Sequence, residues 1–217
     1  MQALIDIFLH FDVHLAEFVA RYGALVYGLL FAIVFAETGL VVTPFLPGDS
    51  LLFAAGALAA TGALDIRLTI ILLIVAAILG DTVNYAAGRV IGPRVFKGDA
   101  SAGRMARLLN REYLERAHEF FERHGGKAIV LSRFVPIVRT FVPFVAGAGA
   151  MRYSTFVIYN VAGGILWVGV CAGAGYAFGQ VPVIRDNFSL VALGIVAVSL
   201  LPVVVEWVRH KKKVQRP

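Results

Sequence analysis

Four charged residues lie within stretches that are otherwise apolar. They are Glu37, Asp49, Arg133 and Arg139. An ionised side chain at the centre of a membrane helix costs at least about 2.5 kcal/mol, so each of them needs a counter-charge or a water-filled cavity. Two acids in one region and two arginines in another predict mutual neutralisation. A purely structural ion-pair lock is one interpretation of this pattern.

An anion-binding site is the second interpretation of the same residues. A guanidinium is a planar fork of donors that matches a phosphate and stays protonated, and backbone amides at the ends of broken helices add further donors. A carboxylate buried in apolar surroundings can bind and release a proton near neutral pH, because burial favours its neutral form. We therefore expect Arg133 and Arg139 to bind a phosphate-bearing ligand, with Glu37 and Asp49 as candidate proton carriers.

Asp81, Tyr85 and Arg89 form a secondary group of candidates at the polar end of an apolar stretch. Asp81 and Arg89 are eight residues apart, which is about two helical turns. The favoured interpretation is that they cap a span at the membrane interface, where such anchors are common. Trp167 and Trp207 are expected only to pack or to anchor at the interface.

The sequence lacks the motifs of several reaction classes. None of its five histidines lies in an expected span or hairpin, which argues against a phosphatase with a histidine nucleophile. It has no Ser/His/Asp constellation, no Walker loop and no His/Cys metal spacing, and Cys171 is its single cysteine. We expect a protein that is not an enzyme and that needs no metal or cofactor.

The composition places the chain in a membrane. Of its 217 residues, 59% are hydrophobic and 16% are charged, against roughly 25% charged in soluble domains. A mean hydropathy of +0.80 is too high for one small globule to hide from water. The net charge of +6 indicates orientation rather than a nucleic-acid partner. The first residues lack a basic start and an Ala-x-Ala site, so no cleaved signal peptide is expected.

The hydropathy pattern predicts one all-α integral membrane domain with about four full spans, two re-entrant helical hairpins and amphipathic interfacial helices. In chain order we expect an interfacial helix (1–20), a span (23–37), a re-entrant hairpin (43–64), a span (66–90), a cytoplasmic amphipathic helix (94–127), a second hairpin (128–151), two spans (153–178 and 188–208) and a basic tail (209–217). The expected hairpin turns are Pro44, Pro47 and Gly48 in the first hairpin, and Pro136, Pro143 and Gly147 in the second.

The basic segments predict the orientation of the chain. Residues 94–127 and the tail are both rich in lysine and arginine, so both are expected on the cytoplasmic side. An even number of crossings must then separate them, which makes the second hairpin enter from the cytoplasm. With a cytoplasmic N-terminus, the first hairpin enters from outside. Opposed broken helices of this kind are typical of secondary transporters.

Four blocks of sequence resemble the signatures of the DedA family. They are Glu37-Thr38-Gly39, then Phe45-Leu46-Pro47-Gly48-Asp49, then Gly80-Asp81 with Tyr85 and Gly88-Arg89, and finally Arg133 and Pro136 through Arg139, Pro143 and Gly147. The resemblance implies a bacterial inner-membrane protein with two opposed re-entrant hairpins, in the SNARE-associated or VTT-domain superfamily that includes lipid scramblases. It also implies links to the proton motive force, to envelope integrity and to movement of undecaprenyl phosphate or phosphatidylethanolamine. Glu37, Asp49, Arg133 and Arg139 match the residues regarded as essential in that family.

The leading hypothesis is a transporter that moves a phosphate-headed lipid between leaflets, with the proton motive force as a candidate energy source. A proton-coupled transporter of small ions or solutes and a non-transporting membrane scaffold are the alternatives. The expected partners are membrane lipids and protons, with a homodimer as a further candidate state. The amphipathic segment 94–127 suits either a protein partner or anionic lipid.

Overall fold

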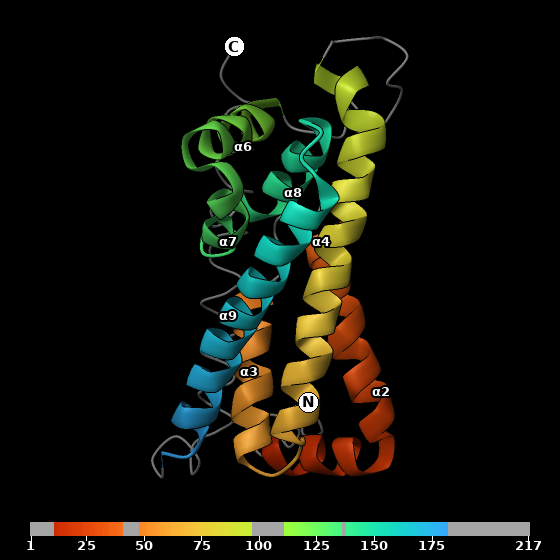
Figure 1. Cartoon of the computed structure of the whole chain (residues 1–217). Helices are drawn as coiled ribbons and strands as arrows, with labels where there is room; N and C mark the ends of the chain where they lie inside the picture. The colour runs from red at the N-terminus through yellow and green to blue at the C-terminus, as the bar shows by residue number, and fades with distance from the viewer. Residues whose placement is uncertain (1–10, 41–47, 97–110, 136–137, 182–217) are drawn as a thin grey trace, which may run out of the picture. The chain divides into compact units, whose positions relative to one another are not determined.

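The computed structural model describes residues 11–40, 48–96, 111–135 and 138–181, and every regular element within them is helical (Figure 1). The elements are α2 (Phe11–Gly39), α3 (Gly48–Ala60), α4 (Ile66–Phe96), α6 (Arg111–His124), the 3-10 helix η2 (Gly125–Lys127), α7 (Ala128–Ser132), α8 (Val138–Ala148) and α9 (Tyr153–Gly179). The predicted all-α class is thereby confirmed.

Three of these helices are long and apolar enough to cross a membrane. The qualifying stretches are Tyr22–Gly39, Ile66–Gly92 and Tyr153–Gly179, with mean hydropathies of 1.5, 2.2 and 1.7. A stretch of 27 residues extends about 40 Å, which exceeds the roughly 30 Å hydrocarbon core. They coincide with the expected spans 23–37, 66–90 and 153–178. The expected span 188–208 and the tail 209–217 lie outside the described residues.

The first long helix is kinked at Tyr22. The helix runs from Phe11 to Gly39, but its backbone is non-helical at Tyr22, where φ is −128° and ψ is 26°. The sequence predicts separate helices over 1–20 and 23–37, and the structure joins the described part of both into one kinked α2. The boundary between the two expected segments therefore coincides with the kink.

The region expected to form the second hairpin contains two short helices. α7 ends at Ser132 and α8 begins at Val138, so the helix ends immediately before Arg133, the first arginine of the block. Pro143 and Gly147, which are expected at turns, instead lie inside α8, where both are buried. A proline within a helix loses one backbone hydrogen bond. Neighbouring helices make such a loss tolerable in a membrane protein.

Only one of the other expected turn residues lies within the described residues. Gly48 is the first residue of α3 rather than part of a turn, while Pro44, Pro47 and Pro136 lie outside the described residues. After α3 the chain turns through Gly62, which has a positive φ of 83°, and enters α4 at Ile66. Only glycine adopts that backbone conformation without steric cost.

The chain divides into two compact units, and three helices contribute residues to both. The first unit comprises residues 1–29, 47–70 and 170–217. Within it, α3 packs closely on the end of α9, because a Cβ atom at Gly56 would collide with the backbone of Ala172. The rings of Phe53 and Phe178 add a tilted contact with centroids 5.8 Å apart. The lack of a side chain at Gly56 therefore allows these two helices to approach closely.

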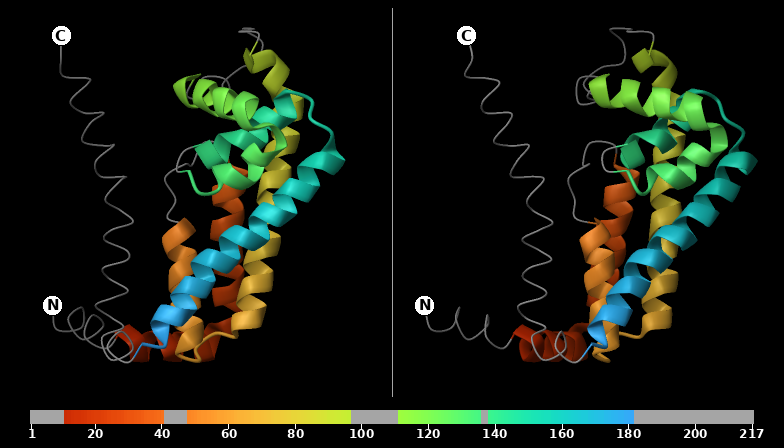
Figure 2. Two further views of the ribbon diagram at one scale, coloured as in Figure 1. Left: turned by 60° about the vertical axis from the view of Figure 1, so that its left-hand side comes forward. Right: turned by 90° about the vertical axis from the view of Figure 1, so that its left-hand side faces the viewer.

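The second unit comprises residues 30–46 and 71–169 and contains an aromatic core. Tyr85, Phe141, Phe144 and Phe156 are buried there, and α6, α7 and α8 pack together in both views of Figure 2. α8 also packs closely on α4, since a Cβ at Gly88 would collide with the carbonyl group of Phe144. The expected amphipathic segment 94–127 is represented by the end of α4, by α6 and by η2, with residues 97–110 outside the described part.

Candidate functional site

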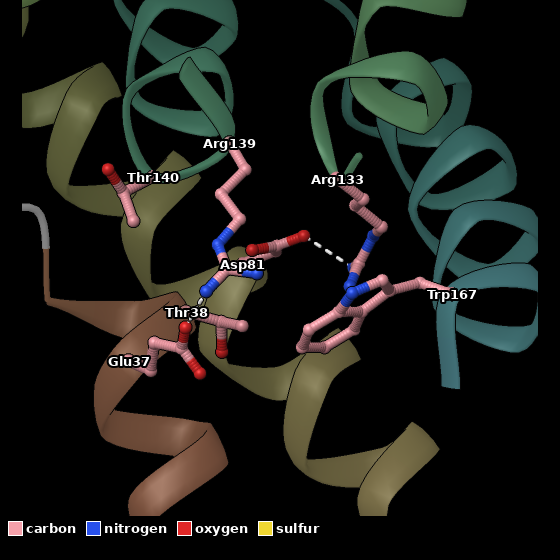
Figure 3. A pocket seen from close by; sticks show the side chains of 7 residues that line it. All are labelled: Glu37, Thr38, Asp81, Arg133, Arg139, Thr140 and Trp167. Carbon is pink, nitrogen blue, oxygen red and sulfur yellow. Dashed lines mark hydrogen bonds and ion pairs between the residues drawn. The ribbon is translucent and has the colours of Figure 1, made fainter. Parts of the chain in front are cut away.

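The second unit contains a small polar pocket that gathers side chains from four helices and from the break after α7. Seven residues line it: Glu37, Thr38, Asp81, Arg133, Arg139, Thr140 and Trp167 (Figure 3). The pocket has a cavity volume of about 10 Å³, which is room for about one water molecule. Its lining joins residues from sequence positions more than a hundred apart, so the pocket exists only in the folded unit.

Arg133 is the first residue after α7 and is almost completely buried, at 4% exposure. Its Nη2 atom donates hydrogen bonds to Oδ2 of Asp81 at 2.5 Å and to Oδ1 of Asn160 at 2.7 Å. The amide nitrogen of Asn160 in turn donates to the carbonyl oxygen of Ile78 at 3.0 Å, which fixes the amide. The Nε atom of Arg133 is buried and has no hydrogen-bond partner among the described residues.

Arg139 lies in the first turn of α8 and forms an ion pair with Glu37. Glu37 belongs to the last turn of α2, and its side chain is 1% exposed, against 12% for that of Arg139. The break between α7 and α8 therefore directs two arginines toward acids from two different helices. In Figure 3 both guanidinium groups point toward the carboxylates of Glu37 and Asp81.

Asn84 ties the ends of two helices together beside this pocket. Its completely buried amide nitrogen donates to the carbonyl oxygen of Thr38 at 3.1 Å and to that of Thr140 at 2.7 Å. Carbonyls near the end of a helix lack the partners that a longer helix would supply. Asn84 satisfies one at the end of α2, and by bonding both it fixes the positions of the helix segments that carry Glu37 and Arg139.

Trp167 of α9 contacts both arginines. The Cζ atom of Arg133 lies 5.6 Å from the centre of the indole ring, and that of Arg139 lies 5.4 Å from it. Both distances are within the roughly 6 Å range of a cation–π interaction. The tryptophan is 1% exposed, so water does not separate the ring from the charges.

The formal charges of the pocket sum to zero when both acids are ionised, since two arginines face two carboxylates. Buried ion pairs of this kind contribute little net stability, because desolvation opposes the attraction, but removing one partner is strongly unfavourable. An incoming anion must share the arginines with the acids or displace them. Among the described residues, no group of three His, Cys, Asp or Glu side chains could hold a metal ion.

The structure brings together three of the four charged residues singled out from the sequence. Glu37, Arg133 and Arg139 share the pocket, whereas Asp49 lies in the other unit, exposed in the first turn of α3. Asp81 is the acid beside Arg133. Its expected role as an interfacial cap is wrong, because it is 4% exposed and bonded to a buried arginine in the interior of α4.

The other secondary candidates lie away from the pocket lining. The hydroxyl group of Tyr85 donates a hydrogen bond to the carbonyl oxygen of Met151 and accepts one from Nη1 of Arg89 at 3.3 Å. Sequence reasoning missed Asn84, Asn160 and Trp167. The two asparagines carried a usable signal, since each is a polar amide inside a long apolar helix, but the tryptophan did not differ from its apolar surroundings.

The chain is similar to a known domain and to several known proteins. A profile of the VTT domain matches residues 46–177. The protein DedA of Escherichia coli K12 is 54% identical over 215 residues, which cover 98% of this chain and 96% of that protein. An uncharacterized membrane protein of Mycobacterium leprae is 44% identical over 173 residues, covering 80% and 75% of the two chains. The inner membrane protein YqjA of E. coli K12 is 40% identical over 159 residues, covering 73% and 70%. No solved structure matches.

Proposed function

The chain belongs to the DedA family of VTT-domain membrane proteins, and on that premise we propose that it is a transporter that moves a phosphate-headed lipid between the leaflets of the inner membrane. The observation that carries the proposal is the pair of arginines in one pocket, each held by a carboxylate. Phosphate and carboxylate bind the same fork of guanidinium donors, so one can replace the other.

The site must open to admit a headgroup. Its cavity volume is about 10 Å³, which is room for about one water molecule. Displacement of Glu37 and Asp81 from the arginines would make that room, and the acyl or isoprenyl chains then remain in the surrounding lipid. Undecaprenyl phosphate and a phospholipid both offer this chemistry.

The charge balance of the pocket supports coupling to protons. A phosphate that enters a pocket whose charges already balance adds negative charge to a buried site, which is unfavourable. Protonation of Glu37 or Asp81 removes that charge and releases an arginine to the ligand. Proton uptake would thus accompany headgroup binding, and the proton motive force would drive transport. Asp49 remains a predicted proton carrier in the other unit.

Reconstitution into liposomes tests the proposal. The intact protein should accelerate movement of a fluorescent phospholipid or of undecaprenyl phosphate between leaflets, and an imposed pH gradient should alter the rate. Arg133→Ala and Arg139→Ala should abolish the acceleration. Arg152→Ala is the control, because Arg152 is exposed immediately before α9 and does not line the pocket.

Two results would overturn the proposal. One is the absence of any acceleration by folded, intact protein. The other is equal acceleration by the Arg133→Ala and Arg139→Ala variants. Proton movement or ionic current in the same liposomes, with no effect on lipid distribution, would support the small-ion alternative instead.

A further inference from the structure

We propose that Trp167 is the positioning residue of this site, and that it holds both guanidinium groups in place while their carboxylate partners are exchanged for a ligand. Arg133 and Arg139 both lie over its buried indole ring, at 5.6 and 5.4 Å. The contact of the arginines with the ring is independent of the ligand, whereas the exchange rests on the proposed function.

Two cations in one buried pocket repel each other, so their positions need to be fixed by other groups. Asp81 and Glu37 contribute to this, since each is bonded to one arginine. These acids belong to different helices, α4 and α2. A ligand that displaces the acids would also remove these restraints.

Trp167 differs from the acids because it does not compete with the ligand for donors. A guanidinium that stacks on an aromatic ring uses its face, and the N–H groups along its edge remain available. Arg133 has one such group, Nε, which is buried and has no hydrogen-bond partner among the described residues. The indole can therefore hold an arginine that is bonded to an acid or to a phosphate.

The burial of Trp167 strengthens this interaction and gives it specificity. The side chain is 1% exposed, and cation–π attraction is larger where water is excluded. Tryptophan is the best of the aromatic residues in this role, and phenylalanine offers a smaller ring. Leucine fills apolar space but has no π system. A Trp167→Leu variant therefore distinguishes a positioning role from simple packing.

Fluorine NMR of the full chain in detergent tests the stacking without any ligand. The chain has two tryptophans, so a Trp207→Phe variant labelled with 5-fluorotryptophan carries its probe at Trp167. Arg133→Gln and Arg139→Gln should each shift the resonance, because each removes a positive charge from above the ring. Arg133→Lys and Arg139→Lys are companion variants that keep the charge but lose the planar group, and they should shift it less. Arg152→Gln, at an exposed position, should leave it in place.

Binding measurements with two soluble probes test the positioning role. The probes are farnesyl phosphate and dihexanoyl phosphatidylethanolamine, which represent the two sources of a phosphate headgroup. We expect Trp167→Phe to weaken probe binding about threefold and Trp167→Leu about tenfold. Phe156→Leu is the matched control, since Phe156 is an equally buried aromatic of α9 in the core cluster. It should lower the melting temperature and leave the affinity unchanged.

The outcomes are distinguishable from a failure of the proposed function. If neither probe binds the unaltered protein, the lipid proposal fails, and the fluorine resonance still decides whether Trp167 holds the arginines. An unchanged resonance in both arginine variants overturns the inference. Full affinity in Trp167→Leu also overturns it. If Trp167→Leu does not fold, the inference is overturned by full affinity in Trp167→Phe combined with a Trp167 resonance that the arginine variants leave unshifted.

Discussion

The Nη2 atom of Arg133 lies 2.5 Å from Oδ2 of Asp81, and this bond joins the break after α7 to the interior of α4. Both side chains are almost fully buried, at 4% and 6% exposure. Each charge is therefore tolerated largely because the other is present. Variants of this pair can separate the stability of the site from its activity.

Replacing Asp81 by asparagine leaves the charge of Arg133 buried with weaker compensation. Removal of one partner from a buried ion pair destabilises a protein by about 3 to 5 kcal/mol, so Asp81→Asn should lower the melting temperature in detergent clearly. The exchanged pair Asp81→Arg with Arg133→Asp should regain much of that stability. It should not regain lipid transport, since the guanidinium then projects from α4. Recovery of transport together with stability would show that the ion pair acts only through stability, and would contradict headgroup binding by Arg133.

Loss of Asn84 should destabilise the second unit without changing any charge. Asn84→Leu removes the donor shared by the carbonyls of Thr38 and Thr140, and a buried group left without its partner costs about 1 to 3 kcal/mol. Thr82→Val is the control on the same helix, because Thr82 is only half-buried and bonds locally to the carbonyl of Ile78. Equal melting temperatures for the two variants would show that Asn84 does not link the helices.

A methyl group at Gly88 should force α4 and α8 apart. An added Cβ would collide with the backbone carbonyl of Phe144, which cannot rotate away, and overpacking of this kind costs about 1 to 3 kcal/mol. Gly169→Ala is the matched control, because a Cβ there meets nothing within 4 Å. In thermal unfolding, the melting temperature of Gly88→Ala should be clearly lower than that of Gly169→Ala. Equal melting temperatures for the two variants would contradict the close approach of α4 and α8.

Ala150→Gly should stabilise the protein. Ala150 follows α8 with a positive φ of 55°, and the backbone bonds from Ala150 to Gly147 and from Met151 to Ala146 form the two-bond helix end that usually carries glycine. Left-handed backbone costs a non-glycine residue about 1 to 2 kcal/mol. Greater freedom of glycine in the unfolded chain offsets part of the gain. Ala86→Gly, at an exposed position inside α4, should have the opposite effect on the melting temperature.

The expected orientation can be checked by labelling single cysteines in a Cys171→Ser background. Thr61 and Glu119 are both exposed, the first after α3 and the second on α6. If basic segments lie on the cytoplasmic side, a membrane-impermeant maleimide should label Thr61→Cys in intact cells and Glu119→Cys only after the membrane is opened. The reverse labelling pattern would show that the orientation is opposite to the expected one. Labelling of both cysteines in intact cells would contradict the expectation that they lie on opposite sides of the membrane.

Charge in apolar surroundings was a sufficient signal for three residues of the pocket. Glu37, Arg133 and Arg139 are recognisable because a charged side chain inside a membrane segment needs a partner. Sequence did not identify which partner each would have. Glu37 and Arg139 are 102 residues apart, and Arg133 and Asp81 are 52 residues apart. Such pairs depend on which helix faces meet, and this is decided by packing rather than by local pattern.

The misplaced expectations have a common physical cause. Pro143 is expected at a turn because proline usually ends a helix, yet it lies inside α8 where surrounding helices bury it. Asp81 is expected at an interface because charged residues commonly anchor helices there, yet it lies opposite a buried arginine. In both cases tertiary contacts override a rule that holds for an isolated helix. Trp167 carried no signal, since an aromatic residue in an apolar span is ordinary.

The place of Arg133 depends on a residue that contributes no side chain. A Cβ at Gly163 would lie 3.1 Å from both Cδ and Nε of the arginine, which is closer than ordinary contact. A methyl group there would therefore displace the arginine by a few tenths of an ångström. A substitution in α9 alone could then adjust the strength of the ion pair with Asp81, with every charged residue left intact. This makes Gly163 a position for engineering the affinity of the site.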